Sequence, residues 1–128
     1  MTITIETSSG SDIEEQQLPL TTENAVAAIS QLDGELTTLV TMAHGQTTLY
    51  VASGPDQFTV TFAMADNRQV YDLVGNAAAE GTERRVIGGQ EIEQPVHLLV
   101  SRDTAVRAAL RFAETGQMDD TATWEEQV

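Results

Sequence analysis

Cysteine and lysine are both absent from this 128-residue chain, and aromatic residues make up only 5% of it. Without cysteine, disulfides, thiolate metal sites and cysteine nucleophiles are all excluded. Long apolar runs are missing too, since no stretch approaches the roughly 20 residues that a membrane-spanning helix needs. The opening residues 1–10 have neither the basic nor the apolar region of a secretory signal. We therefore expect a soluble protein, with a reducing cytoplasm as the default compartment.

Basic side chains are also scarce: six arginines stand against 20 acidic residues, and the formal net charge is -14. A field of this sign repels nucleic acid and anionic membranes, so we expect neither as a partner. It attracts a basic protein and speeds encounter with it. The alternative explanation is solubility, or adaptation to a salty cell interior, which predicts acids that are spread evenly rather than gathered in patches.

The hydrophobic pattern predicts an α+β fold in which two helices pack on an antiparallel β-sheet meander. The length suits a single domain over residues 1–128 with one hydrophobic core. We expect a short first strand over Thr2–Glu6, followed by a polar acidic loop over Ser8–Gln17. The first 20 or so residues and the last few are expected to be less ordered than the rest.

The first helix is expected between Thr22, which can cap its start, and Gly34, which can take the left-handed conformation at its end. Apolar residues at helical spacing predict that it lies across the sheet. These residues are Ala25, Val26, Ile29 and Leu32.

From Glu35 the apolar period falls to two, which predicts consecutive antiparallel strands. The strands are expected over 36–42, 46–53, 58–64 and 70–73, with turns at His44-Gly45, Gly54–Asp56 and Asp66–Arg68. The pattern leaves open whether Gly75–Gly81 is a loop or a short helical turn.

A further strand over Glu83–Ile87 is expected to end at Gly88-Gly89, and an apolar strand entered through Pro95 runs to Val100. Ser101 is expected to cap the last helix, and Gly116 to end it. The buried side of that helix is expected at Val106, Ala109, Leu110 and Ala113, with Phe112 on its flank.

Residues that could carry catalysis or bind a metal form no convincing constellation. His44 falls in an expected turn and His97 in an apolar strand, and neither has a histidine or carboxylate at metal-ligand spacing. Pairs of carboxylates are so common in this chain that no pair stands out as an acid and base. No phosphate-binding glycine loop or nucleophile elbow is present. We therefore assign no catalytic residue, no cofactor and no metal, and we expect a protein that is not an enzyme.

Trp124, the only tryptophan, follows an acidic turn close to the C-terminus. A tryptophan there can anchor the tail on the sheet, or it can be a binding hot spot, and we favour the anchor. Acidic residues on either side of it are expected to form a rim that suits a partner rich in arginine or lysine. These residues are Asp119, Asp120, Glu125 and Glu126.

The order of features in the second half of the chain resembles the first-numbered family of immunity proteins of bacterial polymorphic toxin systems. That family typically shows a helix that ends in Phe-X-X-Thr-Gly, then a short spacer and a tryptophan. Here these are Phe112, Thr115, Gly116 and Trp124. The turn and strand from Asp66 to Tyr71 and the strand entry at Pro95 fit as well. The resemblance is loose over most of the chain and better from Tyr71 to Gln127.

This resemblance implies a small cytoplasmic antidote that binds a cognate toxin domain, often a nucleic-acid deaminase, and blocks it. A toxin that acts on nucleic acid needs a basic substrate surface, which an acidic inhibitor complements. The hypothesis is a monomer that binds its toxin 1:1. The candidate partner contacts are Asp66, Tyr71, Asp119, Asp120, Trp124, Glu125 and Glu126.

Two other functions remain open at this stage. An acidic secretion chaperone would bind an extended segment of an effector and would usually be a dimer. A small ligand-binding or enzymatic α+β domain would need a concave pocket that contains His97, Tyr71 or clustered carboxylates.

Overall fold

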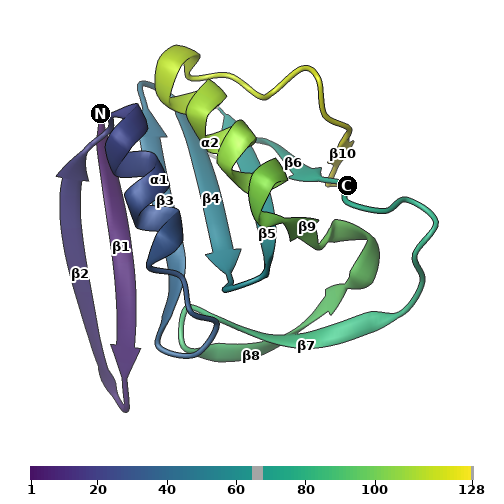
Figure 1. The fold of residues 1–128 in the computed structure, drawn as a ribbon, viewed down its shortest axis with the longest axis horizontal. Coiled ribbons are helices and arrows are strands. Elements are labelled where there is room, and N and C mark those ends of the chain that lie inside the picture. The colour runs from purple at the N-terminus through teal and green to yellow at the C-terminus, as the bar shows by residue number, and fades with distance from the viewer. Residues whose placement is uncertain (65–67, 128) are drawn as a thin grey trace.

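An antiparallel β-sheet runs through the whole molecule, and both α-helices lie on one of its faces (Figure 1). The computed structural model describes residues 1–64 and 68–127, and its strands follow the order β10-β6-β5-β4-β3-β1-β2. The strands on this path are β1 (Thr2–Ser9), β2 (Asp12–Pro19), β3 (Thr37–His44), β4 (Thr47–Ser53), β5 (Gln57–Met64), β6 (Gln69–Leu73) and β10 (Trp124–Glu126). The predicted α+β class, a meander with two helices in one domain, is confirmed.

Three smaller elements and the two helices complete the fold. They are α1 (Thr22–Ser30), the hairpin of β7 (Thr82–Ile87) and β8 (Gln90–Pro95), the 3-10 helix η1 (Val96–Leu98), the two-residue strand β9 (Val100–Ser101) and α2 (Arg102–Thr115). The predicted strand over Glu83–Ile87 therefore exists as β7. Among the described residues, no helix is long and apolar enough to cross a membrane.

The core lies between the sheet and the two helices, and it follows from the two-residue period of the strands. The register places buried side chains in cross-strand rows, Ile3–Met42–Leu49–Phe62 and Ile5–Val40–Val51–Val60. On the buried side of the helices most residues are small, which lets the helices approach the sheet and each other closely. These buried residues are Ala25, Ala28 and Ile29 of α1, and Ala105, Ala108, Ala109 and Phe112 of α2.

Several predicted buried positions of the helices are confirmed, namely Ala25, Ile29, Leu32 and Ala109, but in each helix part of the predicted stripe was misplaced. Val26 is 37% exposed and Ala28 is buried in its place. In α2, Phe112 is fully buried rather than on the flank, whereas Leu110 is only half-buried. Helical spacing alone admits neighbouring stripes, and in α2 the aromatic ring of Phe112, which has the most apolar area to bury, decides which stripe faces the sheet.

Three of the four predicted helix ends need little or no correction. Thr21, not Thr22, caps α1, since its hydroxyl accepts from the N–H of Asn24 at 3.1 Å. Ser101 caps α2 as predicted, by accepting from the N–H of Thr104 at 3.3 Å. Gly116 ends α2 in the left-handed conformation, also as predicted. Gly34 was the wrong end for α1, because that helix ends at Ser30.

The acidic stretch Ser8–Gln17, predicted to be a loop, forms a β-hairpin instead. β1 extends to Ser9, the chain turns at Gly10-Ser11, and β2 pairs with β1 from Asp12 to Pro19. β2 is the outer strand of the sheet and most of it is exposed on both faces. An edge strand of this kind has no reason to alternate apolar with polar residues, so its pairing with β1 left no pattern in the sequence.

The predicted antiparallel pairing of consecutive strands from β3 to β6 is confirmed, and the first turn between them needs correction. The two-residue loop is Gly45-Gln46 rather than His44-Gly45, and His44 is the last residue of β3, paired with Thr47. Gly54–Asp56 turns the chain between β4 and β5 as expected. The turn predicted at Asp66–Arg68 falls largely on residues 65–67, which lie outside the described residues.

The apolar run from Val96 to Val100 is not the predicted strand. Pro95 ends β8 instead of beginning a strand, η1 follows directly, and only Val100 and Ser101 pair with β5. A short apolar run fits a strand or a buried helical turn equally well, and periodicity cannot separate them. The open question over Gly75–Gly81 is settled as a loop, which a turn at Asn76 tightens.

The β7–β8 hairpin lies against the sheet face that the helices leave free. Its apolar Ile87 and Ile92 share a hollow with Leu39 and Ala52 of that face. The guanidinium of Arg85 donates to the carbonyl oxygen of Gln57 at 2.8 Å. The hairpin therefore covers this face of the sheet near the start of β3. Both α-helices lie on the opposite face.

Candidate functional site

The C-terminal segment crosses from the end of α2 to the far edge of the sheet, as the yellow arc in Figure 1 shows. It begins at Gly116, whose φ of 72° allows its N–H to donate to the carbonyl oxygen of Phe112 at 2.7 Å. It ends in β10, which pairs with β6 and forms the edge of the sheet. After Arg111 the chain carries five acidic residues and no basic one.

Trp124 holds this segment against the sheet. It lies opposite Leu73 across the β10–β6 pair, and its ring meets that of Phe62 edge-on at a centroid distance of 6.4 Å. Its indole Nε1 donates to the carbonyl oxygen of Asp119 at 2.9 Å, which closes the turn before β10. This geometry is that of an anchor, the interpretation that the sequence favoured.

Asp119 faces inward, so the expected acidic rim is smaller than the sequence indicated. It is 4% exposed, and its Oδ1 accepts from the N–H and the hydroxyl of Thr121 at 3.1 and 2.6 Å. Asp119 therefore shapes the turn, while Asp120 is left exposed beside it. The sequence could not show this, because two adjacent aspartates in a turn look alike until the turn geometry assigns one of them to the backbone.

The other expected contacts do not all lie together. Glu125 and Glu126 are exposed on β10, and Tyr71 lies opposite Glu126 on β6, half-buried against the core. Asp66 lies outside the described residues. The structure thus brings Tyr71, Asp120, Trp124, Glu125 and Glu126 to one edge of the molecule.

A hollow of about 570 Å³ opens between the end of α2, the β3–β4 turn and the C-terminal segment. We call it the tail hollow. Most of its walls are apolar, and one exposed carboxylate, that of Asp120, lies among its lining residues. The lining residues are His44, Thr47, Phe62, Met64, Thr115, Gly116, Gln117, Met118, Asp120 and Trp124.

The tail hollow rests on a chain of edge-to-face ring contacts. His44 meets Phe112 at a centroid distance of 6.0 Å, and Phe112 meets Phe62 at 6.1 Å. Phe62 in turn contacts Trp124. Such pairs have a preferred orientation, so each ring restrains the next. Three of the four residues of the pattern Phe-X-X-Thr-Gly followed by tryptophan, namely Thr115, Gly116 and Trp124, line this hollow, and the fourth, Phe112, supports it.

His44 and Thr47 join the β3–β4 turn to the end of α2, and the sequence did not reveal either of them. The Thr47 hydroxyl lies within hydrogen-bonding distance of the carbonyl oxygens of His44 and Gly116, at 2.9 and 2.8 Å. These residues are about 70 positions apart from Gly116 in the chain. The histidine-glycine turn was visible in the sequence, but nothing local indicated what packs on it.

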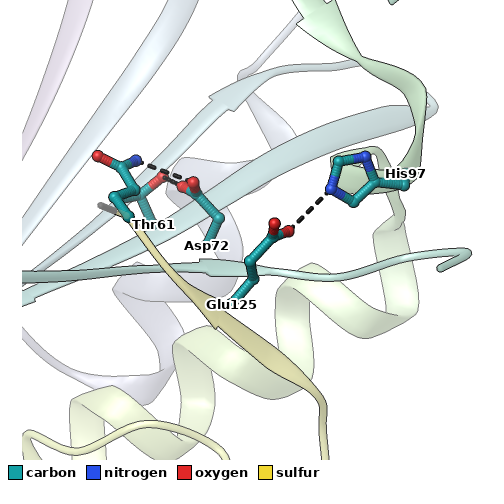
Figure 2. A network of polar contacts seen from close by, with 5 residues as sticks. Thr61, Asp72, His97 and Glu125 are labelled. Carbon is teal, nitrogen blue, oxygen red and sulfur yellow. Dashed lines mark hydrogen bonds and ion pairs between the residues drawn. The ribbon is translucent and has the colours of Figure 1, made fainter. Parts of the chain in front are cut away.

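The other face of β10 carries a polar network, shown in Figure 2. The carboxylate of Glu125 lies 2.8 Å from Nε2 of His97. The carboxylate of Asp72, on β6, accepts from the hydroxyl of Thr61 at 2.7 Å and from the side-chain amide of Gln127 at 2.8 Å. Because side chains alternate along a strand, Trp124 points to the tail hollow and Glu125 to the opposite side of the sheet.

This network is one end of a row that crosses the sheet face opposite the helices, where residues of β7 and β8 border the hollow that Tyr50 and Thr61 line. The strand register aligns Gln17, Thr4, Thr41, Tyr50, Thr61, Asp72 and Glu125. The row presents hydroxyl, amide and carboxylate groups, and its two charged members lie at the β10 end. Such a face can form many hydrogen bonds with a partner and few apolar contacts.

Titratable groups in the described part of the chain are not grouped for metal binding. No set of three histidine or acidic side chains among residues 1–64 and 68–127 is placed to hold a metal ion. His44 packs on Phe112, and His97 pairs with Glu125 at the other side of the sheet. The two sides of this region therefore differ: an apolar hollow with Asp120 among its lining residues lies on one side of the sheet, and a row of polar side chains lies on the other.

Residues 14–126 match the family described as Immunity protein Imm1. A comparison with curated proteins found no match. The matched region begins within β2 and includes the whole C-terminal segment through β10.

Proposed function

The chain belongs to the Imm1 family of immunity proteins, and from this premise we propose that it binds a cognate toxin domain in the cytoplasm and neutralises it without catalysing a reaction. The partner of an immunity protein is a protein toxin. The finer proposals concern which surface of this chain binds and what kind of toxin fits it.

The observation that carries the proposal is the convergence of the family-like residues on one place. Phe112, Thr115, Gly116 and Trp124 come from α2, its end and β10, and they meet around the tail hollow. Packing alone would need an apolar floor here but not an open concave surface. We propose that this edge of the molecule, from the tail hollow to β10, contacts the toxin.

The charge of this edge supports a basic partner. Asp120, Glu125 and Glu126 are exposed here, and the five acidic residues after Arg111 have no basic residue among them. A toxin that modifies nucleic acid carries a basic track for the phosphates of its substrate. Acidic side chains of this edge would occupy that track and exclude the substrate, in a 1:1 complex of monomers.

The β10 end of the polar row provides a second part of the same interface. The row reaches the β10 edge at Asp72 and Glu125, which a partner seated on that edge can also contact. Thr61 and Tyr50 lie farther along the row, in hollows that residues of the β7–β8 hairpin border. Hydrogen-bonding groups of this kind fix the register of a complex more than they raise its affinity.

Co-purification with the toxin domain encoded beside this gene tests the proposal. We expect a stable 1:1 complex by size exclusion with light scattering, loss of toxin activity in the complex, and weaker binding as salt is raised. The absence of binding at low salt would overturn the proposed function. Binding that is indifferent to salt would overturn its electrostatic part alone.

A further inference from the structure

We infer that the tail hollow receives an arginine side chain of the partner protein. The inference rests on the proposed function for the existence of that partner, and it adds the chemistry of the contact. The shape and composition of the hollow, the single carboxylate on its rim and its rigidity each support it.

The walls suit a side chain with a long apolar stem. Phe62, Met64, Met118 and Trp124 are the large apolar residues among those that line it, and a volume of about 570 Å³ admits a side chain together with the backbone that presents it. Arginine buries its methylene stem along apolar surface and places its planar guanidinium against aromatic rings. Arginine and aromatic residues are also the side chains most enriched at interface hot spots.

The rim selects a cation. Among the described residues, Asp120 is the only charged one that lines the hollow, and within that part of the chain its carboxylate accepts no hydrogen bond and forms no ion pair. The inward-facing carboxylate of Asp119 fixes the turn, so Asp120 remains exposed at the rim. A purely apolar occupant would take water from this carboxylate without replacing its hydrogen bonds, which is unfavourable. A guanidinium donates to it in a forked geometry.

The hollow is formed before the partner binds. The Thr47 hydroxyl joins the β3–β4 turn to Gly116, and the indole of Trp124 holds the carbonyl of Asp119. A site that is already rigid avoids part of the ordering cost of association. The hollow can therefore be tested with a single amino-acid derivative, without the whole partner.

The indole N–H of Trp124 gives a direct readout, because the chain has one tryptophan and hence one indole signal in an ¹H–¹⁵N spectrum. We would titrate the protein with N-acetyl-arginine methylamide, with the citrulline analogue, which keeps the length of the side chain but is neutral, and with the norleucine analogue, which keeps only an apolar stem. We expect a saturable shift of the indole signal by the arginine derivative, with a Kd of about 1–10 mM for so small a ligand. The two neutral analogues are expected to bind at least about threefold more weakly.

Asp120→Asn is expected to weaken arginine binding about threefold or more, whereas Asp103→Asn, an exposed carboxylate in the first turn of α2, removes the same charge without effect. Equal shifts with norleucine, or arginine binding that Asp120→Asn leaves unchanged, would overturn the inference. An indole signal that moves with protein concentration alone would also overturn it, since a second copy of this chain would then occupy the hollow.

The toxin domain separates this inference from the proposed function. Binding of the toxin by both the wild-type protein and Asp120→Asn with equal affinity would overturn the arginine contact and leave the immunity role in place. An arginine-specific shift in a protein that does not bind the toxin would overturn the proposed function and leave the hollow as an arginine site.

Discussion

Gly116 packs directly against the imidazole of His44, so closely that a Cβ at position 116 would lie 2.5 Å from Nδ1. The contact joins the end of α2 to the end of β3, and the tail hollow forms where they meet. Glycine is needed here for two reasons, the left-handed backbone at the helix end and the close approach of the ring. Gly116, which the sequence indicated only as the end of a helix, is thus also a packing contact of the candidate site.

Gly116→Ala is therefore expected to destabilise the protein by more than the cost of the left-handed backbone alone. Gly45→Ala is the matched control, because Gly45 also has positive φ but a Cβ there meets nothing within 4 Å. We expect Gly45→Ala to cost about 1 kcal/mol and Gly116→Ala at least about 2 kcal/mol in urea unfolding. Equal losses for the two variants would show that the His44 ring moves aside freely.

Trp124→Phe separates the ring of Trp124 from its hydrogen bond. Phenylalanine keeps an aromatic ring beside Phe62 but loses the N–H that donates to Asp119, so we expect a loss of about 1 kcal/mol in the free energy of unfolding. Trp124→Ala also removes the packing and is expected to cost about 3 kcal/mol. Circular dichroism during urea unfolding measures both, and an unchanged Trp124→Ala variant would contradict the anchor.

Acid is expected to weaken the fold through Asp33, in the loop before β3. The backbone N–H of Glu35 donates to the Asp33 carboxylate, and those of Leu36 and Thr37 donate to it as well. The Glu35 hydrogen bond contributes most to holding the pKa of Asp33 below the ordinary value of 3.8, while burial has a smaller effect that raises this pKa. Because the folded pKa is the lower one, this stabilisation is fully present above pH 3.8 and is lost as pH falls through the folded pKa.

Asp33→Asn tests this, because the amide is a neutral and weaker acceptor. The wild-type protein should be the more stable of the two at pH 7, and the difference should shrink as pH falls below the ordinary pKa of 3.8. Urea unfolding of both proteins across that range measures the difference. A difference in the free energy of unfolding that stays constant with pH would contradict the role of the Asp33 carboxylate in this loop.

The first 20 or so residues were predicted to be less ordered than the rest, and this stays a prediction. The hairpin of β1 and β2 defines which residues test it. Ile3 and Ile5 are buried, but β2 bonds to one neighbour only and is almost entirely exposed. We expect the amides of β2 that face away from β1 to exchange hydrogen rapidly, and those of β1 to be protected. Hydrogen exchange followed by NMR measures each amide, and uniform protection across β2 would contradict reduced order there.

Alternation and capping predicted most of the fold because each of these signals is local. The strands β3 to β6 each place one apolar face on the core, and Ser101 and Gly116 have side-chain and backbone properties that suit helix ends. The hairpin strand β2 and the turn η1 escaped prediction for opposite reasons. β2 buries neither face, and the run at η1 is apolar without a usable period.

The candidate site was predictable only in part, because it depends on contacts between distant residues. The sequence singled out Trp124 and the acids beside it, and the structure brings Asp120, Glu125 and Glu126 to the same edge. It could not show that Asp119 turns inward, since that depends on the hydroxyl of Thr121 and the indole of Trp124. His44 and Thr47 enter the site through long-range packing, which leaves no spacing in the sequence.

The measurement that tests the central claim most directly is the affinity of two charge-reversed variants for the cognate toxin domain. Asp120→Lys with Glu126→Lys changes the C-terminal edge, and Glu14→Lys with Glu15→Lys changes the net charge equally on β2, at the other edge of the sheet. We predict that the first pair weakens binding about tenfold or more and the second less than about threefold. Equal losses, or no loss from the first pair, would contradict the claim that the C-terminal edge binds the toxin.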